Sequence, residues 1–108
     1  MENTENFRVV YVTTTSQEHA EQMAQTLVQE RVAACCSIIP QVVSVYRWNN
    51  AIEQSNEVLL MIKTSVEHLV TLQNLVTQMH PYQVPEILAV PITHVSESYA
   101  AWLRSSLE

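Results

Sequence analysis

The 108-residue sequence predicts a mixed α+β fold with an antiparallel sheet. Three observations lead to this fold class. Two long extended segments meet at Asn49-Asn50, runs rich in β-branched residues occupy 7–14 and 87–92, and two stretches between the strands repeat their apolar residues at helical spacing. Strands and helices therefore alternate along one chain.

The two long segments form a hairpin, because Asn tolerates the positive φ that a two-residue turn requires. With Asn49-Asn50 as the loop, the arms pair Trp48 with Ala51, Tyr46 with Glu53 and Val42 with Glu57. Residues 58–62 are apolar on both faces, which indicates a central, buried strand at the hairpin base.

The hairpin tip has a different character from its base. It carries apolar side chains that one domain of this size leaves exposed, namely Val43, Val45, Tyr46 and Trp48. Contiguous exposed apolar surface usually marks an interface. We therefore expect a second copy of the chain to bury the tip.

The first half of the chain begins with a predicted strand over Phe7–Thr14. Thr15–Glu18 fits a capping box, in which the Thr hydroxyl and the Glu carboxylate satisfy free amides ahead of a helix over roughly 16–31. A strand follows over Ala33–Ile39. Pro40 lacks an amide donor, so we expect a bend or bulge before the strand resumes in the hairpin.

The second half repeats the pattern. Thr64–Glu67 is a second capping box, ahead of a helix over roughly 65–79. Two prolines make 80–86 stiff and extended. A strand over Ile87–Ile92 contains a proline, which favours an edge or a bulge. Ser96 then caps a short last helix.

This order, β-α-β-β-α-β plus a terminal helix, is the ferredoxin-like arrangement of a four-stranded antiparallel sheet with two helices on one face. We expect one domain over 7–108 and a disordered N-terminus over 1–6. The sheet face without helices would be exposed in a monomer, which again favours association.

Composition excludes several classes of protein. Glycine is absent, which excludes Gly-rich phosphate loops. The net charge is −6 and the five basic residues are scattered, so no nucleic-acid surface is expected. No apolar run is long enough to span a membrane, and the polar N-terminus does not resemble a signal peptide, so we expect a cytoplasmic protein. The adjacent Cys35 and Cys36 are interpreted as small strand residues rather than metal ligands.

Several short motifs together resemble the CutA divalent-cation tolerance family. They are Arg31–Cys35, Ile39-Pro40, Ser44–Trp48, Glu57-Val58, Met61–Thr64, His80–Tyr82, Pro85-Glu86 and Leu88–Pro91. The resemblance implies a ferredoxin-like subunit in a homotrimer, with the long hairpins pairing between subunits. It also implies an architecture similar to PII signalling proteins and a part in the tolerance of divalent cations such as copper, without implying an enzyme.

The resemblance also implies a candidate copper site. Some family members are described as holding copper with a Cys near the end of the first strand and His residues before Pro-Tyr. Those positions are Val12 and Met79-His80 here, so only His80 remains as a candidate metal ligand. The alternative is that Met79 belongs to the core and His80 caps the helix. Met79 could also serve Cu(I) as a thioether ligand.

A second candidate site is an intersubunit cleft for a small polar ligand, formed by Tyr46, Trp48, Lys63, Tyr82 and Glu86. Alternatively, Lys63 and Glu86 form a structural ion pair or are solvated strand ends. The remaining histidines, His19, His68 and His94, are expected to be solvated. Three functions remain open: a trimeric binding or signalling protein, a metal-binding tolerance factor, and an enzyme that uses Lys63, Tyr82 and Glu86 in acid–base chemistry.

Overall fold

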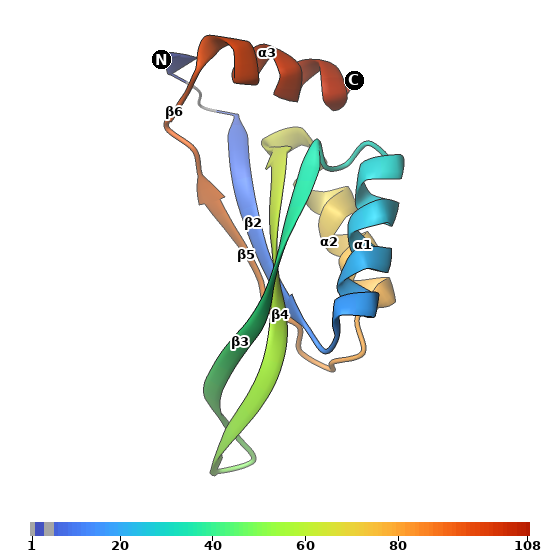
Figure 1. Cartoon of the computed structure of the whole chain (residues 1–108), viewed down its shortest axis with the longest axis vertical. Helices are drawn as coiled ribbons and strands as arrows, with labels where there is room; N and C mark the ends of the chain where they lie inside the picture. The colour runs from blue at the N-terminus through green and yellow to red at the C-terminus, as the bar shows by residue number, and fades with distance from the viewer. Residues whose placement is uncertain (1, 4–5) are drawn as a thin grey trace.

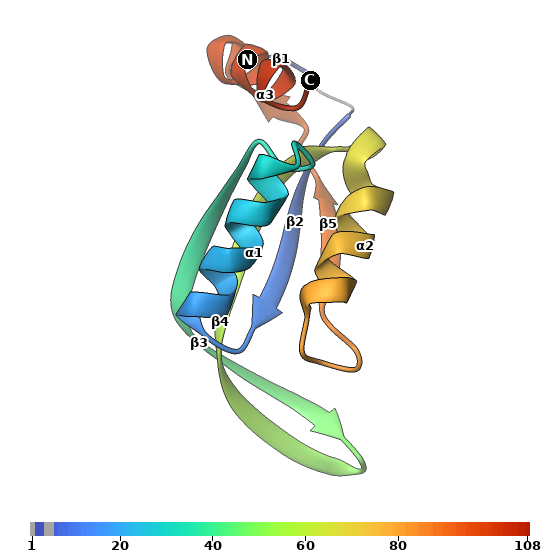
Figure 2. The ribbon, with the colours of Figure 1, turned by 90° about the vertical axis from the view of Figure 1, so that its right-hand side faces the viewer.

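The computed structural model describes residues 2–3 and 6–108, and it confirms the α+β fold class. The elements are β1 (Glu2–Asn3), β2 (Phe7–Thr14), α1 (Gln17–Gln29), β3 (Cys35–Trp48), β4 (Ala51–Ser65), a 3₁₀ turn (Val66–His68), α2 (Leu69–Met79), β5 (Ile87–Pro91), β6 (His94–Val95) and α3 (Glu97–Ser106). Over the described residues the main sheet is antiparallel with strand order β3-β4-β2-β5. Helices α1 and α2 cover one face and α3 crosses one end (Figures 1 and 2).

The hairpin of β3 and β4 projects beyond the sheet at the end opposite α3 (Figure 1). Asn49 and Asn50 have φ values of 50° and 64°, which fits the predicted two-residue turn. The predicted pairing of the arms is confirmed at each pair named above. The register shifts between Ile39 and Val42, where Gln41 has a φ of 62°, so the bulge expected after Pro40 is also confirmed.

The core lies between the sheet and the two helices. Alternate residues of β2 and β4 point into it because side chains of a strand alternate between its faces. The largest fully buried members are Val10, Val12, Leu60 and Ile62 from the strands, Met23 and Leu27 from α1, and Leu72 and Val76 from α2. In a smaller apolar cluster, Ala100 and Leu103 of α3 pack with Phe7 at the end of the sheet.

The other side of the sheet, called here the open face, carries the intervening residues. Its apolar members are Val9, Tyr11, Ile39, Leu59, Met61, Leu88 and Val90. Leu88 is 55% exposed and Val90 is 44% exposed. In a single chain this surface is therefore left to solvent, as the sequence predicted. Within the described residues, no helix is both long and apolar enough to cross a membrane.

The helix starts differ from the predicted capping boxes. Ser16, one residue after the predicted Thr15, is the N-cap of α1, and its Oγ accepts the backbone N–H of His19 at 3.1 Å. The hydroxyl of Thr64 instead donates to the buried carbonyl of Val32 at 2.6 Å. Helix α1 ends at Gln29, so Arg31 with its φ of 59° lies beyond the helix.

Two short strands were not predicted. Glu2–Asn3 pairs antiparallel with His94–Val95 beside α3, so this part of the predicted disordered N-terminus is a strand in the structure. Residues 1, 4 and 5 of the same prediction lie outside the described residues. Ser96 occupies the predicted N-cap position of α3, without a side-chain hydrogen bond to the helix.

Candidate functional site

The polar site lies at the end of the sheet where the hairpin emerges. The Tyr82 hydroxyl, from the loop between α2 and β5, donates to Glu57 Oε2 of β4 at 2.8 Å. Burial, followed by this hydrogen bond and the nearby charge of Glu57, raises the pKa of Tyr82 to about 12. Tyr82 therefore stays protonated at neutral pH and remains a donor. Tyr46 of β3 also contributes to the raised pKa of Tyr82, and its hydroxyl lies 2.8 Å from Ser55 Oγ.

Glu57 belongs to this polar site in the structure, but it was not among the predicted site residues. The last residue pair of β2 with β4 on this side is Thr14 with Val58, and Glu57 lies one residue beyond it toward the hairpin tip. Only 6% of its surface is exposed, although its sequence neighbours toward the hairpin tip are polar. Its signals in the sequence are its position directly before the apolar run 58–62 and its place in the Glu57-Val58 motif. The contact that buries it comes from Tyr82, 25 residues further along the chain.

His80 is a buried structural link in this structure. Its Nε2–H donates to the Thr13 carbonyl at 2.6 Å, and its Nδ1 accepts the Tyr82 backbone N–H at 3.1 Å. Its own backbone N–H donates to the Val76 carbonyl, so His80 caps α2, which was the alternative reading of this residue. Both ring nitrogens are occupied. A metal ion at His80 would have to replace one of these hydrogen bonds.

His19 is not solvated, so the prediction for this residue was wrong. Its Nε2–H donates to the Met79 carbonyl at 2.8 Å, and its Nδ1 lies 2.6 Å from Thr14 Oγ1. The ring therefore joins the start of α1 to the end of α2, 6.0 Å from the ring of His80. Among the described residues there is no group of three or more His, Cys, Asp or Glu side chains that could hold a metal ion.

Lys63 lies toward the other end of the sheet. It pairs with Val9 in the register, whereas Glu86 lies just before Ile87, which pairs with Val12. Lys63 and the start of β5 are thus separated by roughly three residues, or about 10 Å, along the strands alone. Lys63 Nζ donates to Ser37 Oγ at 2.7 Å.

Trp48 and Glu86 are exposed, and Trp48 lies at the hairpin tip. One chain therefore joins Tyr82 to Glu57, with Tyr46 close enough to affect the pKa of Tyr82, but it does not bring Lys63 or Trp48 to them. The predicted five-residue cleft would need a second copy of the chain. The acid–base set of Lys63, Tyr82 and Glu86 is likewise not assembled within one chain.

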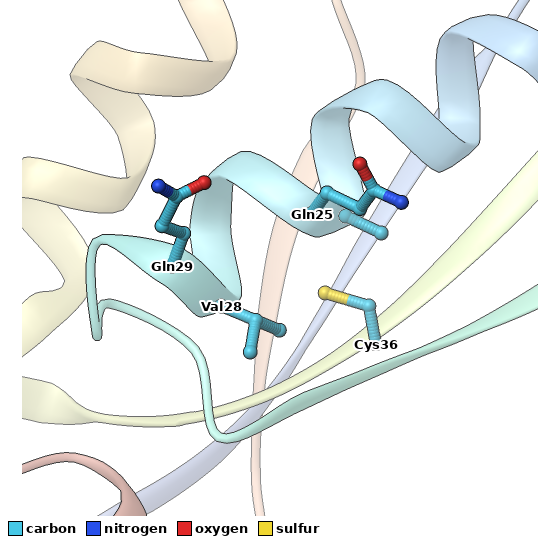
Figure 3. Close-up of a pocket in the computed structure, with 5 residues that line it drawn as sticks. Gln25, Val28, Gln29 and Cys36 are labelled. Atoms are coloured by element: carbon cyan, nitrogen blue, oxygen red, sulfur yellow. The ribbon is translucent and has the colours of Figure 1, made fainter.

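A shallow groove of about 430 Å³ lies between α1 and the edge strand β3 (Figure 3). It is lined by Ala24, Gln25, Val28, Gln29 and Cys36. Burial, with a smaller effect of the neighbouring Cys35, raises the pKa of the Cys36 thiol to about 12. The thiol is therefore protonated at neutral pH and is not an activated nucleophile. Both cysteines are free, as expected for strand residues.

The fold and the site define a ferredoxin-like α+β protein with a projecting hairpin and a tyrosine–carboxylate pair at the hairpin base. The family model described as CutA1 divalent ion tolerance protein matches residues 8–106. The chain belongs to this family, which is named for ion tolerance rather than for catalysis.

One relative and two solved structures match this chain over nearly their whole length. The Divalent-cation tolerance protein CutA of Thermus thermophilus is 42% identical, covering 91% of this chain and 95% of the relative. The structure of CutA from Synechococcus elongatus PCC7942 is 39% identical with a TM-score of 0.94, over 99% of this chain and 95% of that one. The same Synechococcus protein complexed with a Bis-Tris molecule is 40% identical, with a TM-score of 0.91 and 98% of each chain covered.

Proposed function

We propose that this chain forms a homotrimer that acts in the tolerance of divalent cations, copper among them, by binding a metal ion or a small ligand in clefts between subunits. The observation that carries the proposal is the exposed apolar surface of the hairpin tip. Val43 and Ile52 are 56% and 64% exposed, and Trp48 is 44% exposed. An unpartnered hairpin of this kind is marginal in water, so another subunit is the natural cover.

Trimer formation also supplies the missing part of the predicted cleft. Tyr82 already contacts Glu57, with Tyr46 close enough to affect the pKa of Tyr82, while Lys63 and Trp48 lie toward opposite ends of the hairpin of β3 and β4. A neighbouring subunit can bring its own Lys63 or Trp48 to this site. Family membership supports the cation-tolerance part of the proposal, because the matching model is described as a divalent ion tolerance protein.

The homotrimer has a direct test. Light scattering at low micromolar protein should give three times the chain mass of 12.3 kDa. Trp48→Ala removes a large aromatic side chain from the tip, and it should raise the concentration at which the assembly dissociates by roughly tenfold or more. Val70→Ala, on the outer side of α2, is the matched control and should leave the mass unchanged. A monomer or dimer mass for the unmodified chain would contradict the proposed assembly.

For copper we expect weak binding, because Val12 stands where the family is described as having a Cys, and both nitrogens of His80 are hydrogen-bonded. Calorimetry with Cu(II) should compare the unmodified chain with His80→Asn, a variant that retains one donor and one acceptor. Affinity weaker than micromolar is expected in both proteins. Submicromolar affinity that is lost in His80→Asn would show that the metal displaces these hydrogen bonds.

The second candidate function is a PII-like sensor of a small ligand that uses no physiological metal. One observation favours it: the Synechococcus relative has been solved with Bis-Tris, which is a small hydroxylated amine. A tyrosine–carboxylate pair beside aromatic side chains offers the polar and apolar contacts that such molecules need. Binding that persists after chelation of all metal would separate this function from metal tolerance.

A further inference from the structure

We infer that the open face is covered by a second copy of the chain, and that Lys63 of one subunit forms an ion pair with Glu57 of the next. The site at the base of each hairpin is then completed by its neighbour. The inference rests on the proposed homotrimer and adds to it the residue that each subunit receives from the adjacent one.

The first observation is that the carboxylate of Glu57 has no cationic partner in the part of its own chain that the structure describes. Among the described residues its side chain accepts one hydrogen bond, from the neutral hydroxyl of Tyr82. Glu57 is nevertheless only 6% exposed. A buried carboxylate is costly unless a cation or several donors compensate for its lost hydration, so a further positive group is expected here.

The second observation is that Lys63 has no anionic partner among the described residues. Its ammonium donates to the Ser37 hydroxyl and, at 3.5 Å, to the Met61 carbonyl, both of which are neutral acceptors. The side chain is half-buried on the open face. Any partner that covers this face would remove more water from Lys63, so the partner must supply a negative charge.

The remaining cations lie elsewhere among the described residues. Arg47 is in the exposed hairpin tip and Arg31 follows α1 on the helical side of the sheet. Arg8 and Arg104 lie at the α3 end, where Arg8 donates to the Phe7 carbonyl and the Arg104 guanidinium lies 5.5 Å from the Phe7 ring. Among the described residues, Lys63 is therefore the one lysine or arginine that lies on the open face of the main sheet.

The third observation is the spacing of the two charges. Glu57 and Lys63 lie on the same strand and, six residues apart, on the same side of it, because Val58, Leu60 and Ile62 point into the core. Six residues of strand span about 20 Å, so the two side chains cannot meet within one chain. Leu59 and Met61 lie between them on the same face.

Identical copies satisfy this pattern without any further partner. In a closed ring each subunit offers one Lys63 and one Glu57, so a single type of contact compensates every charge. The apolar residues of the open face are buried by the same contact. An unrelated protein would need its own matched pair of charges about 20 Å apart across an apolar strip, whereas a second copy of this chain has that pair already.

Charge reversal tests the pairing. Lys63→Glu and Glu57→Lys each place like charges at every interface, so each variant should raise the dissociation concentration of the assembly by at least about tenfold. The double variant Lys63→Glu with Glu57→Lys restores opposite charges between subunits. It should recover most of the unmodified mass in light scattering, and the restored assembly should weaken as salt is added.

Matched controls separate the ion pair from other effects. Arg31→Glu reverses an exposed charge away from the open face and should leave the mass unchanged. Tyr82→Phe removes the hydrogen bond to Glu57 without changing charge. Adding Lys63→Glu to this variant should raise the dissociation concentration by the same factor as in the unmodified chain. If Glu57→Lys does not fold alone, Glu57→Gln combined with Lys63→Met gives a neutral double-mutant cycle in which the two losses should be less than additive.

The outcomes are distinguishable. A trimer in which the two substitutions act additively, with no recovery in the double variant, would overturn the Lys63–Glu57 pairing and leave the proposed function intact. A chain that is monomeric before any substitution would overturn the proposed trimer itself. Recovery in the double variant supports the pairing between subunits, because the spacing along β4 excludes a contact within one chain.

Discussion

Replacing Leu60 with alanine is expected to lower the free energy of unfolding by about 2–5 kcal/mol. Leu60 is fully buried in β4, paired with Val12 on one side and Ile38 on the other, and it packs against the helices. The substitution removes apolar contacts and leaves a cavity that a sheet strand, held by neighbours on both sides, cannot close. Urea unfolding followed by circular dichroism measures the change.

Val70→Ala is the matched control for Leu60→Ala. Val70 lies on the outer side of α2 and is 72% exposed, so its truncation should change the free energy of unfolding by less than about 0.5 kcal/mol. Both variants must be compared at one protein concentration, because association contributes to the stability of an oligomer. A loss of less than about 1 kcal/mol for Leu60→Ala would show that the core repacks.

The second large effect is expected for His80→Ala, at about 2–4 kcal/mol of unfolding free energy. The substitution leaves the Thr13 carbonyl and the Tyr82 backbone N–H without their partners and removes a side chain that is only 8% exposed. The loop 80–86 should then separate from β2. Denaturant unfolding gives the stability, and limited proteolysis should show new cleavage within this loop.

His94→Ala is the control for this second effect. His94 is exposed, and its side chain contacts the hydroxyl of the adjacent Thr93, so little stability should be lost. If His80→Ala were as stable as His94→Ala, the buried hydrogen bonds of His80 would contribute nothing measurable. His80 would then have a role other than stability, and copper binding at His80 would be the first role to test again.

The hairpin could be predicted from the sequence because its signals are local. Asn49-Asn50 sets the turn, and in a two-residue loop the turn fixes the pairing of both arms. Pro40 marks the bulge for an equally local reason, since it lacks a donor for the ladder. The edge position of β5 follows the same logic, with a proline at its end.

The site was harder to predict because its contacts join distant parts of the chain. Tyr82 was found from the rigidity of its proline-flanked loop, but Glu57 was assigned to the polar arm of the hairpin and to a family motif, and not to the site. Its burial depends on a side chain from another element. His19 shows the same limit. The first turn of a helix is usually solvated, and only the packing of α1 beside the end of α2 encloses this ring.

The capping residues illustrate a smaller ambiguity. Thr15 and Ser16 are adjacent and both can cap a helix, so composition alone does not decide between them. The structure uses Ser16. At the second helix Thr64 could serve equally well by its chemistry, but a carbonyl from the segment after α1 accepts its hydroxyl instead. Such choices depend on which backbone groups the tertiary fold leaves unpaired.

The strand order also has a consequence for synthesis. β2 is made early but lies between β4 and β5, and its pairing with β5 joins Val12 to Ile87 and Arg8 to Pro91. During translation one edge of β2 therefore stays open until nearly the whole chain has left the ribosome, whereas the hairpin of β3 and β4 closes on neighbouring residues. Contacts of such long sequence separation form late and slowly. The nascent chain should thus expose an unpaired apolar strand for most of its synthesis, the state in which chaperones bind.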